Sequence, residues 1–181
     1  MNINKINNQI TSCTQCILHK HRKNAVPGIG NICAEIMMIG EAPGIYEDEL
    51  GLPFVGRAGH ILYDILMDNG IPKSSLYITN VIKCRPPKNR IPNKKEINEC
   101  KIYLMREINL IKPKIICIMG NIAYSTILGG KNIIKNRGRL VFHDNQRYFL
   151  TIHPAATIYN KNLFVLLKND IQTLCEFISK Y

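Results

Sequence analysis

GEAPGIYEDELGLPFVGRAG, residues 40–59, lies between a short apolar run and an amphipathic segment. The run before it, 36–39, is typical of a buried β-strand, and the segment after it repeats apolar residues at helical spacing. Five glycines, two prolines and four acids make the stretch itself a long, shaped loop. Ligands of open α/β sheets bind beyond the carboxyl ends of the strands, so we expect this loop to border a pocket for a small molecule or a base. A merely long connection is the alternative, and Phe54 argues against disorder.

Strand and helix patterns alternate along the rest of the chain. Strands are expected at 34–39, 76–82 and 114–119, with a hairpin formed by 139–142 and 147–152. Helices are expected at 3–12, 60–70, 94–110, 121–129 and 163–179. This alternation predicts an α/β fold: a central, twisted, parallel sheet of about four strands, flanked by helices on both faces. We expect a single domain over 1–181, in which 1–33 forms an N-terminal segment.

The charge balance favours a polyanionic partner. Lys and Arg number 24 against 13 Asp and Glu, a formal net charge of +11. Compositional drift toward Lys, Asn and Ile is the alternative. The apolar stretches are too short to span a bilayer, and the N-terminus lacks the apolar core of a signal peptide, so we expect no membrane association. A cytoplasmic location follows as an expectation, associated with the nucleoid if the source is bacterial.

The seven cysteines fall into two groups. An odd count without an export signal argues against a disulfide framework. Three lie in or beside apolar runs and are expected to be small core residues: Cys33, Cys117 and Cys175. The other four form a C-x2-C pair and, after a long gap, a C-x15-C pair: Cys13, Cys16, Cys84 and Cys100. Four thiolates suit either zinc or an iron–sulfur cluster, and the spacing alone does not choose between them.

Polar and small residues follow the predicted strands at their carboxyl ends: Glu41, Asn80, Gly120 and His153. Asn80 stands within an apolar strand, where an amide is either a satisfied core group or a ligand-reading group. The basic stretch 83–95 contains three prolines that keep its first part extended. Because it lies beside the expected pocket, we interpret it as a loop that follows a phosphate backbone.

Several motifs together resemble the family 4 uracil-DNA glycosylases, the iron–sulfur branch of the uracil-DNA glycosylase superfamily. They are GEAPG and GLPFVGRAG in the 40–59 loop, TNVIKCRPP at 79–87, the four-cysteine pattern, and the His153-Pro154 pair. The resemblance extends from Cys13 to the loop after His153. It implies a DNA repair enzyme that flips deoxyuridine out of DNA and hydrolyses its N-glycosidic bond, leaving an abasic site. It also implies a [4Fe–4S] cluster on the four cysteines. The expected partner is uracil-containing DNA, single- or double-stranded, bound by a monomer, and recruitment by a clamp protein stays open.

The resemblance assigns roles in a uracil pocket. Asn80 would read the base, accepting from N3–H and donating to O4, a pattern that cytosine does not match. Phe54 offers a flat apolar face to the ring, and His153 would donate to O2 as negative charge develops on the leaving base. We expect Gly40 and Ala42 to contact the base through their backbone. Glu47 would border the C5 edge and exclude the methyl group of thymine.

Glu41 is expected to take part in catalysis, in one of two ways. The best-known branch of the superfamily carries its catalytic Asp one position later, where this chain has Ala42. Glu41 would position the water or stabilise the sugar cation. The alternative is that it only braces the loop.

Contacts to the DNA strand are expected outside the pocket, from Arg57, Lys88, Arg90, Gly120, Asn121 and Ile158. Ile158 is the expected wedge that enters the vacated stack. Tyr159 follows where family members commonly have a basic residue, which departs from the pattern. The covalent branch of the superfamily has a histidine in its basic loop, and KNRIPNKKE at 88–96 has none, so no covalent uracil adduct is expected.

Two other functions remain possible from the sequence. One is a non-catalytic iron–sulfur DNA-binding protein on the same fold, which an intact set of Asn80, Phe54 and His153 disfavours. The other is a nucleotide-handling hydrolase, which the absence of a GxxxxGK[ST] phosphate loop disfavours.

Overall fold

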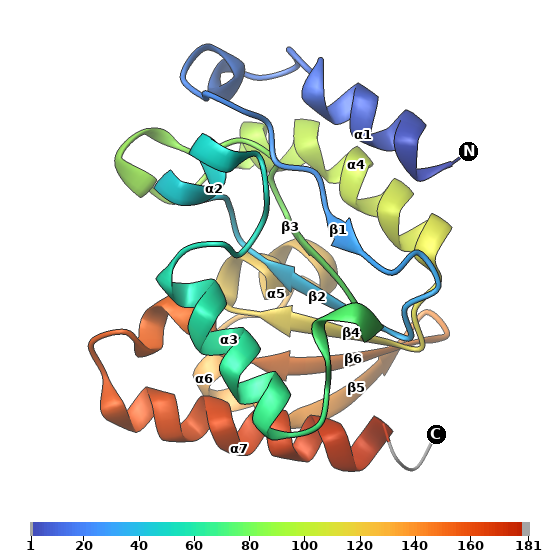
Figure 1. Ribbon diagram of the computed structural model, residues 1–181, viewed down its shortest axis with the longest axis vertical. Helices are drawn as coiled ribbons and strands as arrows, with labels where there is room; N and C mark the ends of the chain where they lie inside the picture. Colours follow the sequence, from blue (N-terminus) through green and yellow to red (C-terminus); the bar gives the residue numbers. More distant parts are fainter. Residues whose placement is uncertain (1, 179–181) are drawn as a thin grey trace.

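The structure, a computed structural model, describes residues 2–178. Within these residues six strands form one sheet in the order β1-β3-β2-β4-β6-β5. The strands are β1 (Ile29–Gly30), β2 (Ile36–Gly40), β3 (Leu76–Asn80), β4 (Ile115–Met119), β5 (Arg139–His143) and β6 (Gln146–Thr151). Figure 1 shows the sheet running through the middle of the molecule.

The four central strands are parallel, as the sequence predicts. β3, β2, β4 and β6 pair in parallel, whereas β1 and β5 close the two edges in antiparallel orientation. The hairpin of β5 and β6 is also as expected. The edge strand β1 was not predicted, because two residues are too short to show a hydrophobic period.

Helices cover both faces of this sheet. They are α1 (Ile3–Thr11), α2 (Ile45–Leu50), α3 (Arg57–Asp68), α4 (Lys94–Ile111), α5 (Asn121–Leu128), α6 (Ile133–Asn136) and α7 (Lys161–Ile178). In Figure 1, α3 and α7 lie in front of the sheet, α5 lies behind it, and α1 lies beside α4 at the end near β3. The sequence predicts that the C-terminal helix ends at residue 179, which lies outside the described residues. No helix among the described residues has the length and apolarity needed to cross a bilayer.

The loop at 40–59 is shorter than the sequence indicated, because it contains α2 and because α3 begins at Arg57. The Glu47 carboxylate accepts hydrogen bonds from the Gly44 N–H at 3.0 Å and from the Gly56 N–H at 2.8 Å. One side chain therefore caps α2 and also ties its start to the start of α3. Three of the four acids in this stretch, Glu47, Asp48 and Glu49, lie in α2 rather than in a loop.

The core lies on both sides of the central strands. All residues of β2, β3 and β4 are buried, which explains why these strands are continuous apolar runs rather than alternating ones. Cys117 belongs to this core, as expected, and Cys175 is half-buried on α7. The expectation for Cys33 was wrong. It is exposed, in a turn before β2 where its N–H donates to Asn31 Oδ1 at 2.9 Å.

A buried carboxylate joins α7 to the sheet. Asp170 is 1% exposed and accepts two hydrogen bonds from Arg137, at 2.8 and 2.5 Å, and a third from the Thr151 hydroxyl at 2.7 Å. These contacts fix α7 against the end of β6, the strand that leads into His153. The ion pair therefore stabilises the segment that carries one of the predicted site residues.

Asp170→Ala is expected to lower the free energy of unfolding by about 3–5 kcal/mol, because it removes the carboxylate that pairs with the Arg137 guanidinium and accepts from the buried Thr151 hydroxyl. Chemical denaturation measures the change. Glu35→Ala is the control, since Glu35 pairs with Lys114 on the surface, and its loss is expected to cost less than about 1 kcal/mol. Equal losses in the two variants would contradict the assignment.

Candidate functional site

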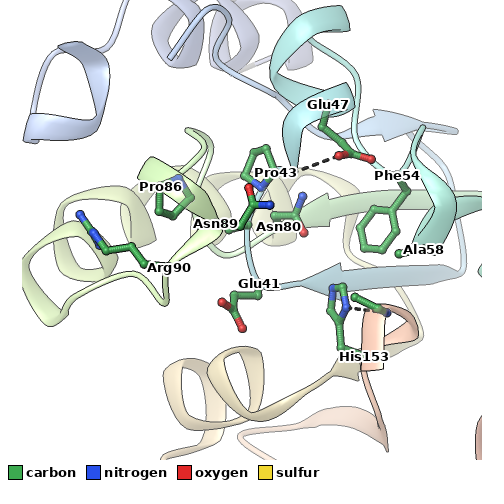
Figure 2. A pocket seen from close by; sticks show the side chains of 13 residues that line it. Glu41, Pro43, Glu47, Phe54, Ala58, Asn80, Pro86, Asn89, Arg90 and His153 are labelled. Atoms are coloured by element: carbon green, nitrogen blue, oxygen red, sulfur yellow. Dashed lines mark hydrogen bonds between the residues drawn. The ribbon is translucent and has the colours of Figure 1, made fainter. Parts of the chain in front are cut away.

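A cavity of about 250 Å³ opens at the carboxyl edge of the sheet. Four segments line it: 41–47 with 54–58, the end of β3, the stretch 86–90, and 153–155. Figure 2 shows Asn80 at the back of the cavity, Phe54 and His153 on one side, and Arg90 at its outer edge. The predicted base-reading residues therefore meet in one place, although they come from distant parts of the chain.

Gly40, the last residue of β2, lies where three of these side chains meet. A Cβ atom built on Gly40 would lie 2.5 Å from Asn80 Oδ1, 2.6 Å from Phe54 Cζ and 3.1 Å from His153 Nε2. Real Cβ atoms essentially never come within 3.0 Å of another heavy atom, as this one would with Asn80 and Phe54. Any other residue at this position would displace Asn80 or Phe54, so the glycine is a condition for the pocket to form.

Asn80 ends β3 and is 2% exposed. Its Oδ1 atom is buried and has no hydrogen-bond partner among the described residues. An unpaired buried carbonyl oxygen costs about 1–3 kcal/mol, so such atoms are rare in folded proteins. The position of this oxygen in the cavity makes it an acceptor for a bound ligand.

His153 places its second nitrogen in the same cavity. Its Nδ1 atom accepts a hydrogen bond from the Ala155 N–H at 3.2 Å, whereas Nε2 is buried without a partner. Burial lowers the pKa of His153 to about 4, so the ring is neutral at pH 7. Because Nδ1 acts as the acceptor, the single ring proton resides on Nε2. His153 therefore presents a neutral N–H donor to the cavity.

Phe54 closes the side of the cavity next to His153. Its ring centroid lies 5.9 Å from that of His153, with 30° between the planes. Phe54 has a φ angle of +54°, a left-handed conformation that costs about 1–2 kcal/mol for a residue with a side chain. A Cβ on Gly59 would lie 1.9 Å from the Phe54 carbonyl oxygen, so α3 packs directly against this strained backbone. The ring position is thus fixed by the start of α3.

The two acids in the cavity wall differ in their partners. Both Glu47 oxygens accept backbone N–H groups, so this side chain organises the loop while it lines the pocket. Glu41 also lines the pocket, but no hydrogen bond or ion pair to its carboxylate occurs among the described residues. Burial raises the pKa of Glu41. Glu41 is the acid whose oxygens are available to a ligand or to water.

The predicted DNA-contacting cations lie around the mouth of the cavity and differ in availability. Arg57 begins α3 and stacks on the Tyr159 ring, with 5.4 Å from guanidinium carbon to centroid. Lys88 is exposed in the segment beside the pocket. Arg90 forms two hydrogen bonds with Glu96, at 2.8 and 2.6 Å. Its charge is thus partly offset, whereas Arg57 and Lys88 form no ion pair with any residue of the described range 2–178.

The start of α5 and the segment after His153 hold the remaining predicted contacts. The Gly120 N–H donates to the Thr151 carbonyl at 2.9 Å, and Asn121 Oδ1 accepts from the Ile133 N–H at 2.8 Å. Both groups therefore have partners within the protein. Ile158 is half-buried, whereas its neighbour Tyr159 is 91% exposed. The most exposed large side chain beside His153 is thus one that the sequence did not single out as the wedge.

The four predicted metal ligands line a second cavity, together with Arg22 and Lys83. All four are free thiols: Cys13, Cys16, Cys84 and Cys100. The Arg22 guanidinium donates to Cys84 Sγ at 3.0 Å, and the Lys83 backbone N–H donates to Cys100 Sγ at 3.2 Å. No three His, Cys, Asp or Glu side chains of residues 2–178 are arranged to hold a metal ion. The sulfur atoms surround the cavity rather than one ion position.

This donor set fits a thiolate-ligated group. Burial raises the pKa of Cys100 to about 12, so this sulfur becomes a thiolate only if a metal replaces its proton. The N–H···S hydrogen bonds from Arg22 and Lys83 would stabilise the resulting charge.

Comparison with known proteins agrees with this arrangement. The family model of the uracil DNA glycosylase superfamily matches residues 27–175. A type-4 uracil-DNA glycosylase of Sulfurisphaera tokodaii is 43% identical over 96% of this chain and 84% of its own length. Enzymes of the same name from Archaeoglobus fulgidus and Thermotoga maritima are each 38% identical, over 95% and 97% of this chain and 91% and 94% of their own lengths. A type-5 uracil-DNA glycosylase of Pyrobaculum aerophilum is 26% identical over 86% of the chain. The chain therefore belongs to the uracil DNA glycosylase superfamily and, within it, to the type-4 uracil-DNA glycosylases.

Proposed function

We propose that this protein removes uracil from DNA by hydrolysing the N-glycosidic bond of a flipped deoxyuridine, in DNA repair. The observation that carries the proposal is the pair of buried, unpartnered polar atoms in one cavity, Asn80 Oδ1 and His153 Nε2. Both lie at the backbone of Gly40, and the Phe54 ring lies beside them. One acceptor, one donor and one flat apolar face match the edge and the face of a uracil ring.

Asn80 supplies the base selectivity in this proposal. Its Oδ1 accepts from uracil N3–H, while its amide N–H2 donates to O4. Cytosine presents an unprotonated N3 and an amine at these positions, so both pairs would be mismatched. Each unpaired buried group costs about 1–3 kcal/mol, which together gives a discrimination of about 30-fold to more than 10⁴-fold.

His153 supplies stabilisation of the leaving group. Negative charge moves onto the uracil oxygens as the glycosidic bond breaks. An Nε2–H group directed at O2 stabilises that charge without taking part in a proton transfer. A neutral donor suits the task, because the depressed pKa of His153 keeps the ring uncharged over the physiological range and the Ala155 N–H at Nδ1 fixes the tautomer.

Glu41 acts on the sugar side in this proposal. Its partnerless carboxylate would orient the attacking water or stabilise the cation-like sugar. Glu47 has a different task, since both of its oxygens already hold backbone N–H groups. It keeps the loop wall in place beside the C5 edge of the base.

Contacts to the DNA strand come from the rim of the pocket. Arg57 and Lys88 are exposed cations that would pair with phosphates on either side of the flipped nucleotide. We assign the wedge to Tyr159 rather than to Ile158, because Tyr159 is exposed and is supported by the Arg57 guanidinium, whereas Ile158 is half-buried. An aromatic ring can stack on the bases that flank the gap.

The four cysteines would hold a [4Fe–4S] cluster. Their layout around a cavity, with N–H···S bonds to two sulfurs, supports a cluster over a single zinc ion. When bound, the cluster supplies a cross-link between the N-terminal segment, the residues after β3 and α4. No catalytic step in this proposal passes through it.

The test of the function is release of free uracil from an oligonucleotide, followed by alkaline cleavage at the abasic site. Asn80→Asp is expected to lose most uracil activity and to gain weak cytosine release that grows at lower pH, because only the protonated carboxyl can donate to N3. Products are compared on U:G, C:G and unpaired C substrates. Should Asn80→Asp and Asn80→Ala both act at the wild-type rate, the base-reading role of Asn80 would be wrong. DNA binding without uracil release by the wild type would favour a non-catalytic protein.

The lowered pKa of His153 predicts how the free energy of unfolding depends on pH. The folded-state pKa of about 4 lies below the ordinary value of 6.5, so the native state binds fewer protons than the unfolded state between these pH values. The resulting contribution of His153 to the free energy of unfolding is fully present above pH 6.5. It is lost as the pH falls toward 4, which lowers the free energy of unfolding by about 2–4 kcal/mol. His153→Gln should flatten this part of the stability–pH curve, measured by chemical denaturation. His143→Gln, on an exposed hairpin tip, should leave it unchanged, and a steep curve in both variants would refute the assignment.

The cluster is tested by metal content. Anaerobically purified protein is expected to contain about four irons per chain and to show the broad visible absorption of a thiolate-ligated cluster. Cys100→Ala should lose iron and folded protein, whereas Cys33→Ala, which changes an exposed thiol, should keep both. Stoichiometric zinc without iron would show that the ligand set holds a different metal.

The wedge assignment is tested by two neighbouring substitutions. Tyr159→Ala is expected to weaken binding to double-stranded uracil DNA by about 5- to 150-fold, the value of one stacked base, with a smaller effect on single strands. Ile158→Ala should affect stability more than binding, because its side chain is half-buried. Fluorescence anisotropy on matched duplex and single-stranded oligonucleotides measures both. A larger binding loss for Ile158→Ala would return the wedge to Ile158.

A further inference from the structure

A buried ion pair lies directly beneath the base pocket but does not line it. The Lys83 ammonium is 2.6 Å from Glu107 Oε2, with the two side chains 2% and 0% exposed. Lys83 follows β3, and Glu107 lies on the buried face of α4. Neither of these two side chains has a role in the function proposed above.

Every polar group of this pair has partners. The Lys83 ammonium donates to Thr79 Oγ1 at 2.5 Å, to the Asn80 carbonyl at 2.9 Å and to Glu107. Glu107 also accepts from the Thr79 hydroxyl at 2.9 Å and, through its other oxygen, from the Gly28 N–H at 2.9 Å and the Tyr77 hydroxyl at 3.3 Å. The network therefore joins β3, α4 and the residue that precedes β1, without leaving an unpaired charge.

The network holds the backbone of the base-reading residue. Hydrogen bonds fix three groups of Lys83. Its ammonium donates to the Asn80 carbonyl, its backbone N–H donates to Cys100 Sγ at 3.2 Å, and its carbonyl accepts from the Val26 N–H at 2.7 Å. The peptide after Asn80 is hydrogen-bonded on both sides, because the Val81 N–H donates to the Gly40 carbonyl at 2.9 Å and the Asn80 carbonyl accepts from the Lys83 ammonium. The ammonium therefore holds the carbonyl side of the peptide that follows the base-reading residue.

Stability alone does not account for such a pair. Desolvation offsets most of the attraction between buried charges, so apolar side chains of similar volume often stabilise a fold as well or better. An ammonium with three fixed acceptors specifies geometry in a way that an apolar side chain does not. The acceptor that matters here is the Asn80 carbonyl, because Asn80 Oδ1 must stay in the cavity without a partner until a base arrives.

We propose that Lys83 and Glu107 are positioning residues that orient Asn80 for base reading, an inference that rests on the function proposed above. They touch neither base nor sugar. Their contribution passes through the Asn80 backbone to the direction of its amide, and hence to the selectivity for uracil over cytosine.

The test is a double-mutant cycle between the ion pair and Asn80. Lys83→Met with Glu107→Gln removes both charges while keeping their volume. This pair of changes is expected to lower the single-turnover rate on uracil DNA about tenfold, the size of coupling found within one hydrogen-bond network, and to reduce the selectivity against cytosine. In an Asn80→Ala background the same pair of changes should have no further effect on the rate. Lys114→Met with Glu35→Gln, a surface ion pair, is the matched control and should leave rate and selectivity unchanged.

Iron content and thermal unfolding are measured on each variant, because the Lys83 backbone also contacts Cys100. Wild-type rate and selectivity in a folded, iron-loaded double variant would overturn the proposal. An equal rate loss in the Asn80→Ala background would overturn it too, since the pair would then act independently of Asn80. If the double variant does not fold, Thr79→Val supplies the same test by removing the hydroxyl that links the two charges. A wild-type protein that releases no uracil would instead refute the proposed function itself.

Discussion

The pocket depends on the absence of a side chain at Gly40. Asn80, Phe54 and His153 come from three separate segments; the first two approach the Gly40 position more closely than a Cβ atom allows, and His153 lies at 3.1 Å. The parallel pairing of β2 and β3 places Gly40 opposite Asn80, and β6 brings His153 to the same edge. The strand order brings Asn80 and His153 to the same edge of the sheet, and the missing side chain of Gly40 leaves room for them to approach each other. A base can then occupy the space between them.

The same pocket combines unsatisfied and fully satisfied polar groups. Asn80 Oδ1 and His153 Nε2 are buried without partners, which destabilises the folded protein until a ligand binds. The surrounding networks offset this cost and also restrict motion. Glu47 fixes the loop wall and Asp170 fixes the helix behind His153. A preorganised site of this kind needs rigid neighbours, because a free polar atom would otherwise turn toward the nearest backbone group.

The sequence predicts the parallel strands and the positions at their carboxyl ends, because continuous apolar runs and the residues that follow them are local signals. It does not predict α2, because that helix depends on a non-local contact. The Glu47 carboxylate that caps it also accepts from the N–H of Gly56, nine residues later. Cys33 and Cys84 both adjoin apolar runs, yet one is exposed and the other buried. The Lys83–Glu107 pair is invisible to any local pattern, because its members are 24 residues apart and lysine is rarely buried. Tertiary contacts alone decide these cases.

The distribution of charge follows from the chemistry of the ligand. Uracil is neutral and DNA is a polyanion, so cations belong at the rim and neutral donors belong inside. Arg57 and Lys88 are exposed at the rim, and Arg90 is paired with Glu96. Inside, the donor is an uncharged imidazole, because burial removes the water that would solvate an imidazolium. In the proposed function the net charge of +11 thus attracts the DNA strand, whereas recognition and release of the base depend on two neutral side chains, Asn80 and His153.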